Sequence, residues 1–331
     1  MDRRRTLTSV VLAAAVVAAV PLQALAEPLN KVGSISLGSV SGPINGLALD
    51  FANQRLFVLE GGAGRLAVVD LAAGSVSQTL QGLAAPTGLA RAPAENRLYV
   101  GTGEGKIAIY SGVPLAPQPG ISMGPDLGAL HYDAGSERIY LGFGAKKIAI
   151  LDTTHNKHWN DIRLDGRPGP IALEDGGSLL FVGAVGEKRI MVADRDGNKQ
   201  TASWATGDNA DPLSLALDED AGRLIAVFKQ PAALAWFDLT DGSLKGQAEA
   251  CTNPGQLLAD GSRNIVYLTC GDGRIDIYRR DAAGSYAKTG SIDTAAGATA
   301  ALIVPISGRL YLAVPSVNGQ PAEIRVYAPA S

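Results

Sequence analysis

The fold is decided by the stretch Leu47-Ala-Leu-Asp-Phe-Ala-Asn-Gln-Arg-Leu-Phe-Val58, which returns 42 residues later as Leu89-Ala-Arg-Ala-Pro-Ala-Glu-Asn-Arg-Leu-Tyr-Val100. Around the first copy, residues 43–82 contain four short apolar runs, separated by residues that favour turns. A repeat of about 40 residues with four strands in each unit is typical of a β-propeller blade. The stretch therefore serves as the template for the rest of the chain.

The same pattern occurs seven times at nearly even spacing. Its first apolar run predicts the innermost strand of each blade, over Leu47–Asp50, Gly88–Ala92, Leu130–Asp133, Ile171–Glu174, Leu215–Asp218, Leu257–Asp260 and Ala301–Val304. Helical periodicity is absent from the repeats, and many of the 40 Gly and 18 Pro fall at the turns. The sequence thus predicts an all-β, seven-bladed β-propeller.

The last repeat lacks a fourth strand, because only four residues follow Tyr327. The run from Lys31 to Leu37 precedes the first repeat and belongs to no other blade. We expect it to pair with Glu323–Tyr327 as the outermost strand of the last blade. This pairing would close the ring with both ends of the chain and cover an exposed strand edge.

The first 26 residues have the pattern of a signal peptide. Three arginines precede an apolar run, and Ala24-Leu25-Ala26 is a small-x-small cleavage site. A membrane anchor is the alternative, but the run is shorter than the roughly 20 residues that a spanning helix needs. We therefore expect a signal peptide over 1–26, one propeller domain over 27–331, and a periplasmic or secreted protein.

The charge balance restricts the partners. Without residues 1–26, which contain three Arg and one Asp, the chain has 26 basic and 31 acidic side chains. A mildly acidic chain with no basic run argues against nucleic acid and anionic membranes as partners. No later segment is apolar enough to span a membrane. We expect a monomer that binds a periplasmic protein or a small molecule.

The two cysteines, Cys251 and Cys270, flank the innermost strand and its partner in the sixth repeat. Antiparallel pairing of these strands would bring the two residues nearly opposite each other, and an oxidising compartment favours a disulfide there. Such a bond would close a loop of about 20 residues and stabilise the fold by roughly 3 kcal/mol. Two free thiols or a redox pair are the alternatives.

Candidate binding residues lie in the loops that lead into the innermost strands, because these loops meet at one mouth of a propeller. Turns between the second and third strands share this face. The predicted ligand-binding set is Asn45, Glu60, Asp126, Arg167, Asp208, Asp211, Lys229 and Asn253. His131, on an innermost strand, can also line the channel. A solvated polar rim is the alternative interpretation of the whole set, and no metal site is assigned.

The repeats of this chain resemble the YVTN-type β-propeller repeats of secreted bacterial proteins. Pro86-Thr-Gly-Leu-Ala90 with Arg97-Leu-Tyr-Val100 is the clearest instance, and the likeness extends over all repeats. The resemblance implies a propeller fold and export. It implies no settled activity and no catalytic residues.

Three functions are consistent with these patterns. The first is a binding or scaffolding module without catalytic activity, which the varied loops and the lack of a catalytic motif favour. The second is a lactonase-like hydrolase, in which the mouth carboxylates would hold a divalent cation such as calcium that activates water. The third is an accessory subunit of a periplasmic oxidoreductase. No cofactor is firmly implied, and the catalytic residues of a hydrolase cannot be named.

Overall fold

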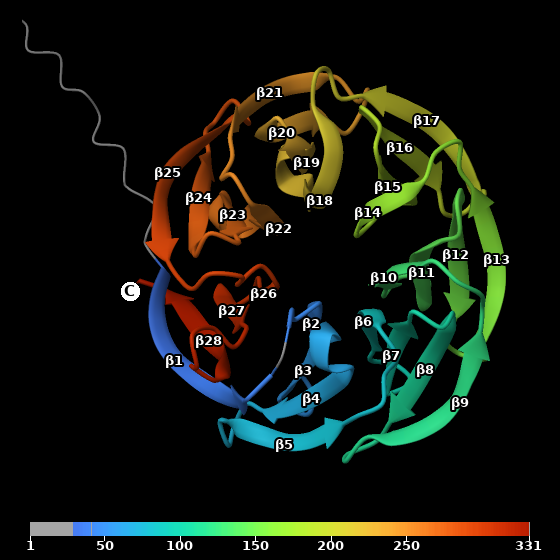
Figure 1. Cartoon of the computed structure of the whole chain (residues 1–331). Coiled ribbons are helices and arrows are strands. Elements are labelled where there is room, and N and C mark those ends of the chain that lie inside the picture. Colours follow the sequence, from blue (N-terminus) through green and yellow to red (C-terminus); the bar gives the residue numbers. More distant parts are fainter. Residues whose placement is uncertain (1–28, 41, 331) are drawn as a thin grey trace, which may run out of the picture.

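The computed structural model describes residues 29–40 and 42–330. Their strands form seven four-stranded antiparallel sheets, arranged as blades around a central axis (Figure 1). The protein is a seven-bladed β-propeller, which confirms the fold that the repeats predict. The expected signal peptide, 1–26, lies outside the described residues. The described part of the chain forms no helix of the length and hydropathy that crossing a membrane requires.

Each blade consists of four consecutive antiparallel strands, except at the ring closure. Blade one contains β2 (Gly46–Asp50), β3 (Arg55–Glu60), β4 (Arg65–Asp70) and β5 (Ser75–Leu80). Blade two contains β6 (Pro86–Ala92), β7 (Arg97–Thr102), β8 (Lys106–Ser111) and β9 (Ala116–Ser122). Blade three contains β10 (Leu127–Asp133), β11 (Arg138–Phe143), β12 (Lys147–Asp152) and β13 (Lys157–Arg163). Blade four contains β14 (Pro168–Leu173), β15 (Leu179–Ala184), β16 (Arg189–Asp194) and β17 (Lys199–Ala205). Blade five contains β18 (Ala210–Asp218), β19 (Arg223–Gln230), β20 (Ala232–Asp238) and β21 (Leu244–Glu249). Blade six contains β22 (Pro254–Asp260), β23 (Ile265–Cys270), β24 (Arg274–Arg280) and β25 (Tyr286–Asp293). Blade seven contains β26 (Ala301–Val304), β27 (Arg309–Val314), β28 (Ala322–Pro329) and β1 (Leu29–Gly38). Three short 3₁₀ turns connect strands: η1 (Gly61–Ala63), η2 (Glu219–Ala221) and η3 (Gly261–Arg263).

This order gives the ring two different faces. The hairpins between first and second strands and between third and fourth strands lie on one face, which we call the hairpin face. The turns between second and third strands lie on the opposite face, together with the loops that join one blade to the next. We call those loops the interblade loops and their face the interblade face.

The N-terminal strand closes the ring, as the incomplete last repeat predicts. β1 pairs antiparallel with β28, and Ile35 lies opposite Ile324 and Ser36 opposite Glu323. In Figure 1 the blue β1 runs along the outside of the red last blade. Blade seven therefore depends on both ends of the chain, and the outer edge of β28 is paired.

The core lies between neighbouring blades. Between blades seven and one, Ile35 and Tyr311 pack in one cluster with Leu56 and Val58 of β3. All six residues of β3 are buried, because the second strand of a blade is covered on both faces by the adjacent blades. Such burial of apolar side chains is the main stabilising contribution in a ring of sheets.

Aspartates at the ends of innermost strands, buried at Asp50 and Asp218 and half-buried at Asp133, tie pairs of blades together. Asp50 accepts two bonds from Arg55 and faces Arg91 of blade two at 3.5 Å. Asp133 of blade three pairs with Arg195 of blade four at 2.5 Å. Asp218 of blade five accepts from Tyr286 Oη of blade six at 2.7 Å. These carboxylates are fully engaged in the fold.

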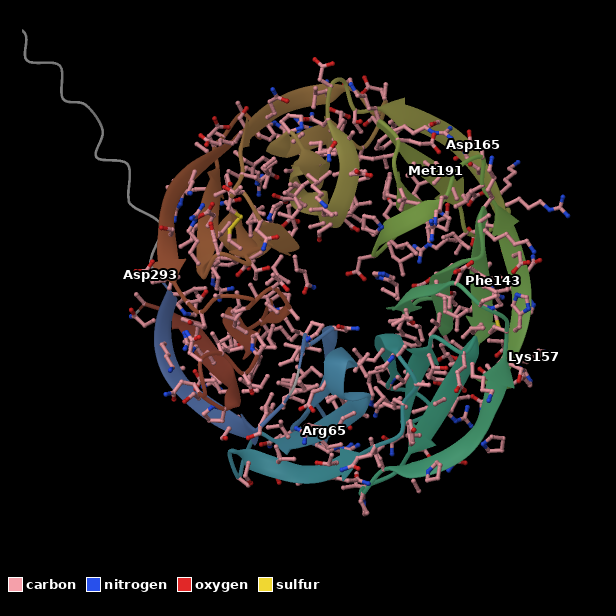
Figure 2. All side chains as sticks on the ribbon, in the orientation of Figure 1. Arg65, Phe143, Lys157, Asp165, Met191 and Asp293 are labelled. Atoms are coloured by element: carbon pink, nitrogen blue, oxygen red, sulfur yellow. A yellow bond between two sulfur atoms is a disulfide. The ribbon has the colours of Figure 1, made fainter. Side chains whose placement is uncertain are left out.

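The predicted disulfide is present between Cys251 and Cys270, and both residues are buried. It joins the loop before β22 to the end of β23, where Cys270 lies opposite Pro254 in the strand register. Figure 2 shows the sulfur–sulfur bond inside blade six. The bond holds the start of an innermost strand at the interblade face.

Candidate functional site

The mouth of the central channel on the interblade face is a cavity of 820 Å³. All seven blades contribute to it through their interblade loops and the first residues of their innermost strands, over 43–47, 87–89, 128–131, 168–171, 213–215, 254–257 and 299–300. With every described side chain drawn, the centre of the ring is still open (Figure 2). We call this hollow the interblade mouth.

The wall of the interblade mouth is uncharged. Among the described residues that line it there is no Asp, Glu, Lys or Arg. Apolar side chains alternate with polar ones, the latter being Asn45, Thr87, His131, Ser214, Gln256 and Thr299. A cavity of this volume, apolar with a few fixed polar groups, has the character of a site for a small molecule.

Hydrogen bonds between blades fix the polar side chains of the wall. Asn45 Nδ2 donates to the Pro86 carbonyl at 2.8 Å. Ser214 Oγ accepts from the Leu257 amide at 3.0 Å, and Gln256 Oε1 accepts from the Ala301 amide at 3.1 Å. Each bond joins one blade to the next, so the same side chains that would meet a ligand also hold the ring together.

Some hydrogen-bonding capacity is left for a ligand. Within the described part of the chain, Asn45 Oδ1 and Gln256 Nε2 have no protein partner, which leaves one acceptor and one donor group. Leu213, 40% exposed, adds an apolar surface to the wall. Polar groups held in fixed orientations beside apolar surface select ligands by shape and hydrogen bonding.

His131 lies deeper in the channel, in the wall of the interblade mouth and also of a second cavity at the hairpin face. Desolvation among the innermost strands lowers the pKa of His131 from 6.5 to about 4. The imidazole is therefore neutral at neutral pH, and the channel wall carries no charge at this depth.

Of the eight residues predicted from sequence, Asn45 alone lines the interblade mouth. Glu60 is fully buried and forms an ion pair with Arg65 across β3 and β4. Asp208 is fully exposed and lies 3.7 Å from Lys188. Both carboxylates therefore have local partners within or between blades, away from the channel.

The other predicted residues occupy separate places on the same face. Asp211 Oδ1 accepts from the Gly186 amide at 2.7 Å, which connects two neighbouring blades. Lys229 is exposed at the end of β19, and the exposed Asn253 accepts from the Gly271 amide through its backbone carbonyl. Asp126 and Arg167 do lie together, in the wall of a smaller cavity of 310 Å³ near blades three and four. This smaller cavity shares Thr87, Gly128 and Pro168 with the wall of the interblade mouth, so Asp126 and Arg167 lie beside that mouth.

The described residues contain one group of three potential metal ligands, Cys251, Cys270 and Asp276. Two of these are joined in the disulfide, so their sulfurs are not available as thiolate ligands. At the interblade mouth, the described residues bring no three carboxylates or imidazoles within ligand distance of one another. The arrangement of charges that a calcium-dependent hydrolase needs is therefore not found at this mouth.

Sequence reasoning missed most of the mouth residues. Thr87, Ser214, Gln256 and Thr299 are small or neutral polar residues close to the start of an innermost strand. Thr87, Ser214 and Gln256 lie one to four residues after the start of an innermost strand, and Thr299 lies two residues before one; this shared position is a repeating signal that could have identified them. The predicted set consists mainly of charged residues, whereas the described residues that line the interblade mouth are uncharged.

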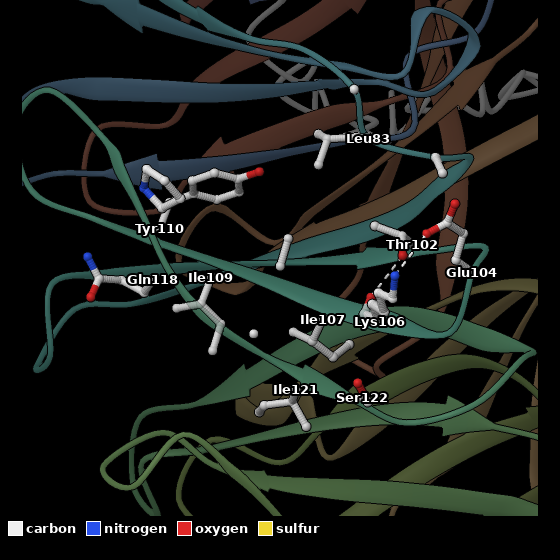
Figure 3. A pocket seen from close by; sticks show the side chains of 15 residues that line it. Leu83, Thr102, Glu104, Lys106, Ile107, Ile109, Tyr110, Gln118, Ile121 and Ser122 are labelled. Carbon is white, nitrogen blue, oxygen red and sulfur yellow. Dashed lines mark hydrogen bonds and ion pairs between the residues drawn. The ribbon is translucent and has the colours of Figure 1, made fainter.

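A separate groove of 400 Å³ lies in the outer half of blade two, between β8 and β9 (Figure 3). The strand register shifts here between Ile107, which lies opposite Ile121, and Ile109, which lies opposite Gln118, so Pro119 and Gly120 fall within the shift. Since proline cannot donate to the strand ladder, the outer strand separates from its neighbour at this point. The hollow follows from this irregular pairing. At one end of it, Glu104 and Lys106 form an ion pair that is exposed to solvent.

Comparison with solved structures finds a similar chain in hydrazine synthase from Kuenenia stuttgartiensis. The TM-score is 0.74 at 14% sequence identity, and the match covers 88% of this chain and 97% of that chain. At this identity the likeness shows the propeller fold alone. No family model and no curated protein sequence matches the chain.

Proposed function

We propose that this protein is an exported β-propeller that acts as a binding module without catalytic activity. Its ligand would occupy the interblade mouth and would be uncharged, with an apolar body and groups that hydrogen-bond to Asn45 and Gln256. The observation that carries the proposal is the uncharged wall of the 820 Å³ cavity. A buried charge on the ligand would find no counter-charge there, and its desolvation would oppose binding.

The same observation favours a binding module over a hydrolase. Metal-assisted hydrolysis needs a cation held by several oxygen ligands next to the substrate. The carboxylates predicted for that role have partners elsewhere, such as Glu60 with Arg65 and Asp208 with Lys188. His131 is isolated from carboxylates in the channel wall, so it lacks the partner that would orient it as a base.

Two further observations support export and a scaffold role for the propeller. The Cys251–Cys270 bond supports export, because disulfides persist in oxidising compartments. The regular repeats that resemble the YVTN-type propellers support a secreted scaffold in which function lies in residues that do not repeat. A monomer, with a periplasmic protein or a small molecule as partner, is part of the same proposal.

A thermal-shift screen of the full chain tests the proposal. The panel contains neutral hydroxylated and aromatic compounds, matched anionic and cationic analogues, and calcium alone. We expect some neutral compounds to raise the melting temperature, and charged analogues and calcium to leave it unchanged. The rise should be smaller for Gln256→Ala, because this change removes the free donor of the wall.

Asp208→Asn provides the control, since this fully exposed residue is on the same face and lines neither the interblade mouth nor the adjoining cavity of Asp126. It should bind the neutral compounds as the wild type does. Calcium-dependent stabilisation together with turnover of a lactone would overturn the proposal in favour of the hydrolase. Absence of any neutral compound that stabilises the protein would also contradict it.

A further inference from the structure

The hairpin face of the ring is strongly acidic over one sector. The four hairpins between first and second strands of blades two to five span residues 93–96, 134–137, 174–178 and 219–222. They contain no Lys or Arg, and they carry Glu95, Glu137, Glu174, Asp175, Glu219 and Asp220. Negative charge is therefore concentrated on one side of this channel mouth.

Within the described part of the chain, none of the six carboxylates forms an ion pair, and Arg195, which donates to the Glu174 carbonyl, is paired with Asp133. The arginines that come directly after two of these hairpins in the sequence have other partners. Arg138 stacks over the Trp159 ring at 3.7 Å, and Arg223 pairs with Asp238 at 3.1 Å. The six hairpin carboxylates differ in this respect from the buried aspartates of the same face, such as Asp218, which forms an ion pair with Arg280. The acidic sector is thus uncompensated.

Large apolar side chains are exposed at the tips of the inner hairpins of blades seven and one. Ile306, in the inner hairpin of blade seven, is 91% exposed, and Phe51, in the adjacent hairpin of blade one, is 75% exposed. Val113, 62% exposed, lies in an outer hairpin of blade two, which Arg55 of blade one holds by a bond to the Gly112 carbonyl at 3.0 Å. Large apolar side chains gathered on an exposed surface mark interaction sites.

Two adjoining hollows lie between the acidic sector and these apolar hairpin tips, at the second mouth of the channel. One, of 540 Å³, is lined mainly by apolar side chains such as Leu47, Leu49, Leu302 and Val304. The polar residues of its wall are His131, Tyr132 and Arg91, the last of which is paired with Asp50. The other, of 520 Å³, has an apolar floor, and Asp175, Glu219 and Asp220 are in its wall. Leu173 and Ile303 line both hollows, so the apolar and acidic hollows are continuous.

We propose that the hairpin face docks a segment of a partner protein that combines apolar side chains with Lys or Arg. The apolar side chains would pack against Phe51 and Ile306 and enter the apolar hollow. The cationic side chains would meet the carboxylates of Glu219 and Asp220, which supply the charge that such a segment lacks. This surface is at the opposite end of the channel from the interblade mouth. The hollows share wall residues such as Leu47 and His131, but Phe51, Ile306, Glu219 and Asp220 line no part of the interblade mouth.

Fluorescence anisotropy with labelled synthetic peptides tests the docking surface. The peptides have one length and differ only in composition: apolar with lysine, apolar with glutamate, apolar without charge, and lysine-rich with serine in place of the apolar residues. We expect the apolar, lysine-containing peptide to bind most tightly, and binding to weaken as salt is raised. Phe51→Ser with Ile306→Ser should weaken it about tenfold, and Glu219→Gln with Asp220→Asn about fivefold.

Two single changes serve as controls, Val32→Ser on the outer strand β1 and Asp126→Asn on the interblade face, and both should bind as the wild type does. Equal binding of the glutamate-containing peptide, or no binding by any peptide, would overturn the proposal. Full competition by spermine would also overturn it, since that result would indicate a site for small cations. Unchanged affinity in both double variants would exclude the hairpin face.

Discussion

At the scale of single residues, the channel wall depends on groups that are neutral and already engaged. Asn45, Ser214 and Gln256 each bridge two blades, yet Asn45 and Gln256 keep one hydrogen-bonding group free. The buried charges lie further out and are paired, as Glu60 is with Arg65. A charged side chain in a sequence repeat is thus more informative about how blades are joined than about what the channel binds.

His131 predicts a pH dependence of stability. Desolvation lowers its pKa from 6.5 to about 4 in the folded protein, so the unfolded chain binds more protons between these two values. The free energy of unfolding should therefore fall as the pH drops from 6.5 towards about 4, and His131→Gln should reduce this slope. Chemical denaturation at several pH values measures it.

The control is Thr87→Val, a change without a titratable group in the same wall. It should lower stability by a similar amount at every pH and leave the slope as in the wild type. An unchanged slope in His131→Gln would show that His131 does not titrate as its position in the channel implies.

At the scale of elements, the repeat determined most of what was predicted. The seven innermost strands, the closure of blade seven by β1 and the Cys251–Cys270 bond all agree with the structure. These features follow from pattern and register, which are local or repeat along the chain. The convergence of loop side chains from different blades depends on where each loop points, and no spacing in one repeat contains that information.

The closure strand allows a matched comparison on one element. Ile35 is 7% exposed and packs in the cluster between blades seven and one, whereas Val32 of the same strand is 57% exposed. Ile35→Ala should lower the free energy of unfolding by about 3 kcal/mol, because it leaves a cavity in that cluster. Val32→Ala should change it by less than about 0.5 kcal/mol.

Denaturant unfolding with limited proteolysis checks this pair, and cleavage near β28 should appear first in Ile35→Ala. Equal effects of the two substitutions would mean that β1 contributes pairing but no packing to the ring.

At the scale of the whole molecule, the ring presents two different channel mouths. One has an uncharged wall fixed by bonds between blades, and the other lies between an acidic sector and apolar hairpin tips. The fold itself is shared with proteins of low sequence identity, such as hydrazine synthase, and so it does not specify an activity. Function in this protein is therefore expected to lie at the two mouths, where residues differ from blade to blade.

The most direct test of the central claim measures where charge matters for ligand binding. The dissociation constant of the neutral compound that stabilises the protein most is measured for two variants. Gln256→Glu puts a charge into the interblade mouth, whereas Asp208→Asn with Asp211→Asn removes charges outside it. We predict that Gln256→Glu weakens binding about tenfold or more, because the ligand must then desolvate a carboxylate, and that the double variant stays within about twofold of the wild type. The opposite pattern, with loss of binding only in the double variant, would contradict an uncharged site at the interblade mouth.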